Sequence, residues 1–219
     1  MVAVPAMAAT QAYVITSFDA VRIDAPLRVE LTTGRGVAAS GEGPRATLDR
    51  IALSVSGRLL TIRMTPLRPG EKSAGPATLR LSTDDVRRLV MVGGGAVSID
   101  RMKGLGGDII VGGNGDVTVA AVEVDRLTVS LAGGGRVTLS GKAGSADIRL
   151  SGPGELAASG LTAGTARVSN DGPGNIALSV TTSADVRASG TGDVMVIGAA
   201  ACTVANEGAG RVECGGQTY

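Results

Sequence analysis

The sequence predicts an all-β fold, a right-handed parallel β-helix of about seven or more coils with a strand-rich N-terminal capping section. Three observations predict it. Gly-x-Gly corners recur along the chain at offsets of 18 to 20 residues, and aliphatic residues recur at fixed positions around each corner. Only 1% of the residues are aromatic, whereas 34 are glycine, so the interior has to be narrow and lined with small aliphatic side chains.

The corner motif occurs seven times, with its first glycine at Gly93, Gly113, Gly133, Gly152, Gly172, Gly190 and Gly208. The successive offsets are 20, 20, 19, 20, 18 and 18 residues, and such regular spacing is typical of stacked supersecondary units. Glycine suits these corners because a strand has to turn into the next strand within a few residues, with backbones in close approach.

Aliphatic columns flank the corners. Four residues before the first glycine come Leu89, Ile109, Val129, Ile148, Val168, Val186 and Val204. Four residues after it come Val97, Val117, Val137, Leu156, Ile176, Val194 and Val212. Two residues further on come Ile99, Val119, Leu139, Ala158, Leu178, Val196 and Cys214. The spacing of two within a unit is that of a strand. We therefore expect each column to form an apolar ladder, with coils about 4.8 Å apart and a right-handed path.

The chain divides into three sections. Residues 1–12 read as a residual export signal or as a disordered N-terminus, since they contain the small-residue triplet Ala6, Met7 and Ala8 and carry no charge. Residues 13–85 alternate as strands do in "FDAVRIDAPLRVEL" and "IALSVSGRLLTIRM", with a loop at 66–77, and should continue the helix and cover its first coil. Residues 86–219 hold the Gly-x-Gly repeat β-helix. No apolar stretch is long enough for a membrane-spanning helix.

Outward positions carry charges of alternating sign. Three residues after each first glycine come Ala96, Asp116, Arg136, Glu155, Asn175, Asp193 and Arg211. Five residues before the corner, Asp147, Arg167 and Asp185 should likewise sit above one another. We expect exposed pairs of about 0.2–1 kcal/mol each on a solvated charged face.

Composition excludes several kinds of chemistry. The chain has no histidine, which removes Ser-His and Cys-His nucleophile pairs and the commonest transition-metal ligand. The 21 basic and 20 acidic residues are balanced, so we expect no nucleic-acid partner. The segment "GGNGDV" at 112–117 is similar to a calcium-binding repeat, but its Asp116 comes one place early and the period is near 20. We expect no metal and no cofactor.

Parallel β-helices often carry polysaccharide lyases and hydrolases that use carboxylates on one face. The candidates here are Asp108, Asp116, Asp125 and Asp147, but they form no motif, and aromatic platforms for sugar rings are missing. A non-enzymatic protein is therefore our first interpretation. A polysaccharide-processing enzyme acting on one face of the β-helix is the alternative.

The only two cysteines, Cys202 and Cys214, lie on either side of the last corner, and both should point inward in the final coil. In an oxidising compartment they could form a disulfide, provided that their Cα atoms come within about 7 Å. Two buried free thiols are the other interpretation.

The segments "SFDAVRIDAPLRVEL", "RLLTIRM" and "LRLSTDDVRRLVMVGGGAVSI", followed by repeated strand, Gly-x-Gly, strand units, resemble the head GIN domain family of auto-transporter adhesins. The resemblance covers roughly residues 14 to 214. It implies a right-handed β-helix exported to the bacterial cell envelope, with no established activity and no functional residues to carry over. An auto-transporter also needs a C-terminal membrane barrel, and the end "VECGGQTY" carries no such segments, so we expect no self-export.

Together these observations predict an exported protein of the periplasm or cell surface. It would act as an adhesin-like protein or scaffold that presents a rigid β-helix face to an envelope protein or a glycan. Self-association into a homo-oligomer through the uncapped coil end fits the same architecture.

Overall fold

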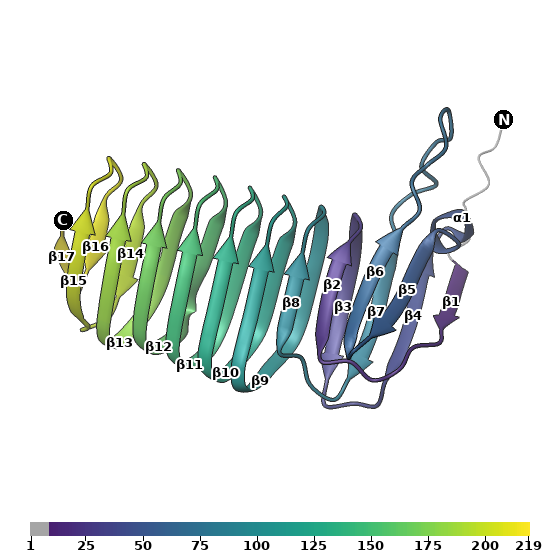
Figure 1. Ribbon diagram of the computed structural model, residues 1–219, viewed down its shortest axis with the longest axis horizontal. Helices are drawn as coiled ribbons and strands as arrows, with labels where there is room; N and C mark the ends of the chain where they lie inside the picture. The colour runs from purple at the N-terminus through teal and green to yellow at the C-terminus, as the bar shows by residue number, and fades with distance from the viewer. Residues whose placement is uncertain (1–8) are drawn as a thin grey trace.

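The computed structural model describes residues 9–219 and shows a parallel β-solenoid of about six turns, close to the number that the corners predict. The predicted fold class is confirmed. The coils stack along one long axis, with the Gly-x-Gly corners aligned on one edge (Figure 1). None of the helices among these residues has the length and apolar character that crossing a bilayer requires.

Each full coil is one long strand that bends between two layers. The repeat region contains β9 (Gly95–Val111), β10 (Asp116–Leu131), β11 (Arg136–Leu150), β12 (Glu155–Asn170), β13 (Asn175–Ala188), β14 (Val194–Ile197), β15 (Ala201–Asn206), β16 (Val212–Cys214) and β17 (Gln217–Thr218). We call the layer that follows the corners, which contains Val117 and Val137, the post-corner face. The layer that precedes them, which contains Val129 and Ile148, is the pre-corner face.

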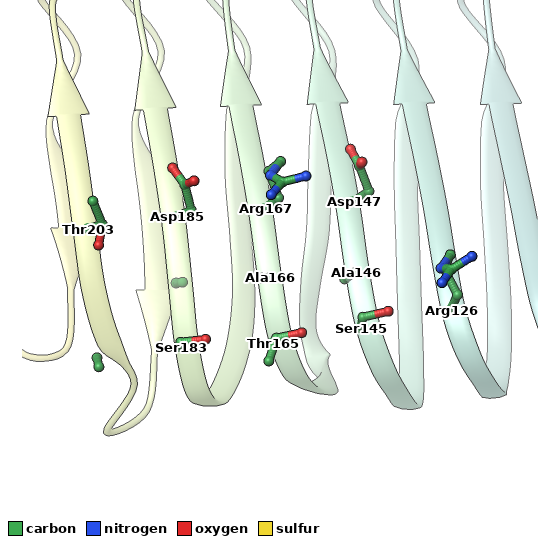
Figure 2. A pocket seen from close by; sticks show the side chains of 12 residues that line it. Arg126, Ser145, Ala146, Asp147, Thr165, Ala166, Arg167, Ser183, Asp185 and Thr203 are labelled. Atoms are coloured by element: carbon green, nitrogen blue, oxygen red, sulfur yellow. The ribbon is translucent and has the colours of Figure 1, made fainter.

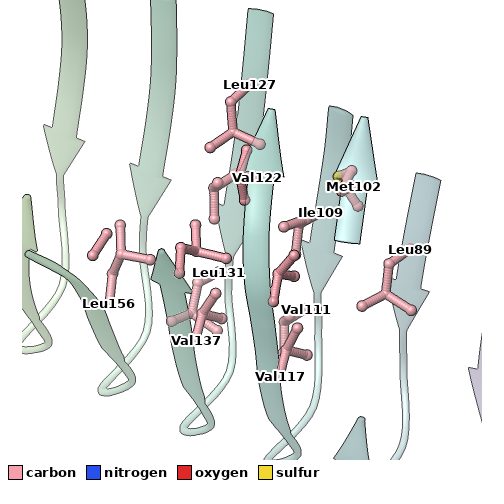
Figure 3. Packing of buried hydrophobic residues seen from close by; sticks show 14 of the residues in the cluster. Leu89, Met102, Ile109, Val111, Val117, Val122, Leu127, Leu131, Val137 and Leu156 are labelled. Carbon is pink, nitrogen blue, oxygen red and sulfur yellow. The ribbon is translucent and has the colours of Figure 1, made fainter. Parts of the chain in front are cut away.

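The strand register places the predicted columns in line. Val117 lies beside Val137, and Val137 beside Leu156, on neighbouring parallel strands. On the other face Val129 lies beside Ile148. These side chains are at most 1% exposed and fill the space between the two faces (Figure 3). Each fully buried aliphatic side chain contributes about 1.5–3 kcal/mol, so like-on-like stacking stabilises the solenoid along its whole length.

The N-terminal section continues both faces before it closes them. It comprises β1 (Ala9–Tyr13), β2 (Ala20–Asp24), β3 (Leu27–Thr33), β4 (Ala38–Gly43), α1 (Arg45–Leu48), β5 (Ile51–Ser56), β6 (Leu59–Met64), β7 (Thr78–Thr83) and β8 (Arg88–Met91). The post-corner face runs on through β3 and β7, and the pre-corner face through β8, β2 and β6, all in parallel. The parallel order ends where β4 pairs antiparallel with β7 and β5 pairs antiparallel with β6.

The first strand and the short helix lie at this end of the solenoid (Figure 1). The Tyr13 hydroxyl donates a hydrogen bond to the carbonyl of Leu48 at 3.0 Å, and the Leu48 side chain is fully buried. Burial, followed by the nearby Asp49 carboxylate, raises the pKa of the Tyr13 phenol. Ala9–Tyr13 pairs with β4, so the folded part begins before residue 13. Ala6, Met7 and Ala8 lie outside the described residues.

The two faces end differently at the C-terminus. On the post-corner face β14 pairs with β16, which turns back into the antiparallel β17. On the pre-corner face β15 pairs with β13, and its outer edge has no strand partner among residues 9–219. Its inward residues Cys202 and Val204 are consequently only half-buried.

The stacked corners require glycine where backbones touch. A Cβ on Gly133 would overlap the carbonyl oxygen of Gly113 on the preceding coil, whereas a Cβ on Gly94 would meet nothing within 4 Å. We therefore expect Gly133→Ala to destabilise the protein by about 1–3 kcal/mol or more, because the clash is with backbone that cannot move aside. Gly94→Ala should stay within about 0.5 kcal/mol of the parent chain.

Denaturant-induced unfolding followed by circular dichroism measures both variants. Equal stability of the Gly133→Ala and Gly94→Ala proteins would contradict the close stacking of the corners.

Candidate functional site

A groove of about 390 Å³ runs across the outside of the pre-corner face. Five consecutive coils, from β10 to β15, supply its lining (Figure 2). We call it the pre-corner groove and define it by its outward side chains, Arg126, Ser145, Asp147, Thr165, Arg167, Ser183, Asp185 and Thr203. Because each coil repeats the same geometry, these side chains stand in rows that run along the solenoid axis.

The first row stands seven residues before each corner and carries hydroxyl groups. It begins at Arg126 and continues through Ser145, Thr165 and Ser183, which lie beside one another in the strand register. The next residue of each strand points inward. At this position Leu127 on β10 lies in register with Ala146, Ala166 and Ala184 on the following coils. Alanine fills less of the interior than Leu127 does, and these three alanines also line the groove on the outside.

The second row is charged. As predicted, Arg167 lies between Asp147 and Asp185 on neighbouring strands. The expected ion pairs between these coils are wrong, however, because each carboxylate pairs along its own strand. Arg149 contacts Asp147 at 3.3 Å and Arg187 contacts Asp185 at 3.4 Å. Residues two apart on a strand point to the same side of the sheet, so Arg149 and Arg187 lie next to the carboxylates that they contact.

A second hollow, of about 630 Å³, joins the groove at Arg126 and extends toward the N-terminal strands. Arg88 and Asp108 meet there at 2.8 Å, and the nearby Leu105 side chain is 83% exposed. The polar surface of the pre-corner face therefore extends from β8 to β15.

The four carboxylates considered as catalytic candidates do not converge. Asp108 and Asp147 stand two coils apart on the pre-corner face, on either side of Thr128, and each is ion-paired with an arginine. Asp116 is on the post-corner face, and Asp125 lies in the bend between the faces, where its backbone carbonyl accepts a hydrogen bond from Ser145. Among residues 9–219 no three potential ligands gather into a metal site.

The acidic residue of the calcium-like segment has a structural partner. The Asp116 carboxylate accepts the backbone N–H of Arg136 on the next coil at 3.2 Å. Asn175 accepts the N–H of Asp193 at 2.9 Å, and Asp193 accepts that of Arg211 at 2.8 Å, in the same column. This column therefore satisfies backbone donors where the chain leaves three of the corners. Only Arg136 and Glu155 form a pair of opposite charges within it, at 2.7 Å.

The hydroxyl row, which supplies most of the uncharged polar groups of the groove, was not predicted from the sequence. Its signal is present in the sequence, because Arg126, Ser145, Thr165 and Ser183 all stand seven residues before a corner.

Cys202 lies on the pre-corner face and Cys214 on the post-corner face, so the pair spans the interior of the last coil. Their Cα atoms are 6.1 Å apart, and the structure joins the two sulfurs. Cys214 is buried, whereas Cys202 is partly exposed at the open edge of β15.

Residues 17–200 match the family described as "Putative auto-transporter adhesin, head GIN domain". No curated protein matches the chain. A "putative adhesin" from Bacteroides fragilis NCTC 9343 is 21% identical, with a TM-score of 0.85 over 94% of this chain and 96% of that one. A "putative adhesin" from Parabacteroides merdae ATCC 43184 is 16% identical, with a TM-score of 0.69 over 95% and 96%.

A third solved structure, described as a "putative lipid binding protein" from Parabacteroides distasonis ATCC 8503, is 19% identical. Its TM-score is 0.70 over 94% of this chain and 95% of that one. At these identities the likeness to the three solved structures concerns the fold alone.

The cysteine pair gives a direct test of the closed last coil. We expect the protein purified without reductant to show no reactive thiol in denaturant and two after reduction. Reduction should lower the free energy of unfolding by about 2–4 kcal/mol, because the cross-link restricts the unfolded chain. A Cys202→Ala, Cys214→Ala double variant should unfold identically with and without reductant. Two free thiols in the unreduced protein would contradict the disulfide.

Proposed function

Because the chain belongs to the head GIN domain family, we propose that it is a non-enzymatic cell-envelope protein, adhesin-like or a scaffold, whose rigid solenoid face binds a protein or glycan partner. The pre-corner groove is the surface that carries this proposal. It presents hydroxyl groups and charges from five neighbouring coils, which are held side by side by parallel strand pairing. A surface held this rigidly loses little conformational entropy when a partner binds.

The state of the carboxylates supports a binding role over catalysis. Asp108 is paired with Arg88, Asp147 with Arg149, and Asp116 holds a backbone N–H group. The chain also lacks histidine, the usual general base near neutral pH. A binding surface needs neither a free base nor a nucleophile.

One observation favours the alternative of a polysaccharide-processing enzyme. Asp147 and Asp185 stand two coils apart on either side of Arg167, which is about 9.6 Å between their backbones. Inverting glycosidases hold their two carboxyl groups about 6.5–9.5 Å apart, and this backbone separation lies at the upper edge of that range. Their ion pairs with Arg149 and Arg187 make this the weaker interpretation.

A lipid-binding role, which the description of one structural neighbour names, has less support in this groove. The outward side chains of the groove are hydroxyl-bearing or charged, and an acyl chain would leave them without hydrogen-bond partners.

Export to the periplasm or cell surface is the second part of the proposal. The family description and the cysteine pair support it, because disulfides persist in oxidising compartments. Self-association is the third part. The free edge of β15, "ACTVAN", carries no charged residue, and uncharged edges readily pair with a strand of a second copy.

We expect loss of binding when the groove is altered. Arg167→Ala should weaken retention of the purified protein on a panel of glycans and envelope extracts by about tenfold, because the guanidinium makes charge-assisted hydrogen bonds. Arg136→Ala is the control, because Arg136 is also an exposed arginine but lies on the post-corner face, where it pairs with Glu155.

Equal retention of the two variants would contradict the assignment of the groove. Turnover of a polysaccharide that Asp147→Asn abolishes would instead support the enzymatic alternative.

Cell fractionation with chemical crosslinking tests the other two parts. Bacteria that express the gene as encoded should hold the protein in the periplasmic or surface fraction, crosslinked to an envelope component. Crosslinks between two copies should involve β15, and Ala205→Lys should remove them, because a charge on the free edge disfavours strand pairing. A cytoplasmic protein would contradict export.

A further inference from the structure

We infer that the pre-corner groove binds an acidic polysaccharide that lies along the solenoid axis, with its acid groups on Arg126 and Arg167. The inference rests on the proposed function of the groove and names the chemical class of the ligand. Both side chains project from the outer surface of the coils (Figure 2).

Two arginines of the groove have no carboxylate partner within the described chain. Arg149 and Arg187 neutralise the carboxylates of Asp147 and Asp185 along their own strands. Arg126 and Arg167 form no ion pair with a carboxylate of residues 9–219. The lining of the groove holds two arginines and two aspartates, and Arg149 and Arg187, beside it on the same face, already balance the two aspartates. The guanidinium groups of Arg126 and Arg167 are therefore left to bind an anion.

The two arginines without ion pairs are widely spaced along the groove. Arg126 lies on β10 and Arg167 on β12, two coils further along, and in register Arg167 is two residues further along the strand. Coils about 4.8 Å apart and a rise of about 3.3 Å per residue put their backbones roughly 12 Å apart. A chain molecule with acid groups at intervals can place one group on each arginine.

Hydroxyl groups lie between the two arginines. The hydroxyl groups of Ser145, Thr165 and Ser183 line the path. Ser145 donates its proton to the Asp125 carbonyl and is left as an acceptor, whereas Thr165 and Ser183 can both donate and accept a hydrogen bond. Sugar hydroxyls have the same dual capacity, so a polysaccharide can satisfy the row at every coil. Carboxylate and sulfate groups match the planar fork of arginine.

The same features disfavour two other polyanions. Single-stranded nucleic acids bind largely by stacking bases on aromatic side chains, and none of the three aromatic residues of the chain lines the groove. An acidic peptide could reach both arginines, but it offers fewer hydroxyl groups to the row between them. Peptide binding is therefore one of the outcomes that the experiment has to distinguish.

Isothermal titration calorimetry against hyaluronan, oligogalacturonate and a sulfated glycosaminoglycan tests the inference, with dextran and poly-glutamate as comparison ligands. We expect binding of at least one acidic polysaccharide, weakened by salt because exposed charges are screened. Arg126→Gln and Arg167→Gln should each raise the Kd about tenfold or more, since each removes a charge-assisted contact. Arg136→Gln, outside the groove, should leave the Kd unchanged.

A second variant separates sugar recognition from charge. Thr165→Val removes one hydroxyl from the row and keeps the shape of the side chain, so it should weaken polysaccharide binding and leave poly-glutamate binding unchanged. Thermal unfolding of every variant verifies that these exposed substitutions leave the fold intact.

Three results would overturn the inference: no binding of any acidic polysaccharide, equal binding of dextran, or tighter binding of poly-glutamate. The proposed function would survive each of them if a partner still crosslinked to the groove in cells. Absence of any ligand, in the titrations and in the crosslinking, would overturn both.

Discussion

The stacking of one corner on the next is the constraint on which the whole solenoid depends. At Gly133 the backbone approaches the carbonyl of Gly113 so closely that a methyl group cannot fit between them. Contact at this distance fixes the register of neighbouring coils, and each residue then stands beside its equivalent one repeat away. Inside, the result is a set of aliphatic ladders; outside, it is a set of polar rows. The groove follows from the same register, because Ser145 and Thr165 line up only if the corners do.

This register explains why so much of the fold could be predicted. Val117, Val137 and Leu156 stand at one offset from successive corners, and the offset alone places them side by side. The bend between the faces gives no comparable signal, since its irregular register includes shifts such as that between Val119 and Val122. The antiparallel closure by β4 and β5 gave none either, because an alternating strand looks the same in both directions.

The candidate site was harder to predict than the fold, because polar residues serve two purposes at the same offsets. Asp116 resembles a metal ligand in the sequence, yet its carboxylate holds the backbone of the next coil. Asn170 stands in the inward row of Leu131 and Leu150, and its fully buried amide donates to the carbonyl of Gly174 at 2.9 Å. The pairing of Asp147 with Arg149 instead of Arg167 depends on side-chain reach, which a repeat pattern does not encode.

The last coil shows how stability and the groove are linked. A ladder strand inside the stack is held from both sides, but β15 is held by strand pairing from one side only, within the described chain. The bond between Cys202 and Cys214 supplies the missing restraint by tying β15 to β16 across the interior. Thr203 follows Cys202 directly and forms the end of the groove. The cross-link therefore also restrains the strand that carries the last member of the polar row.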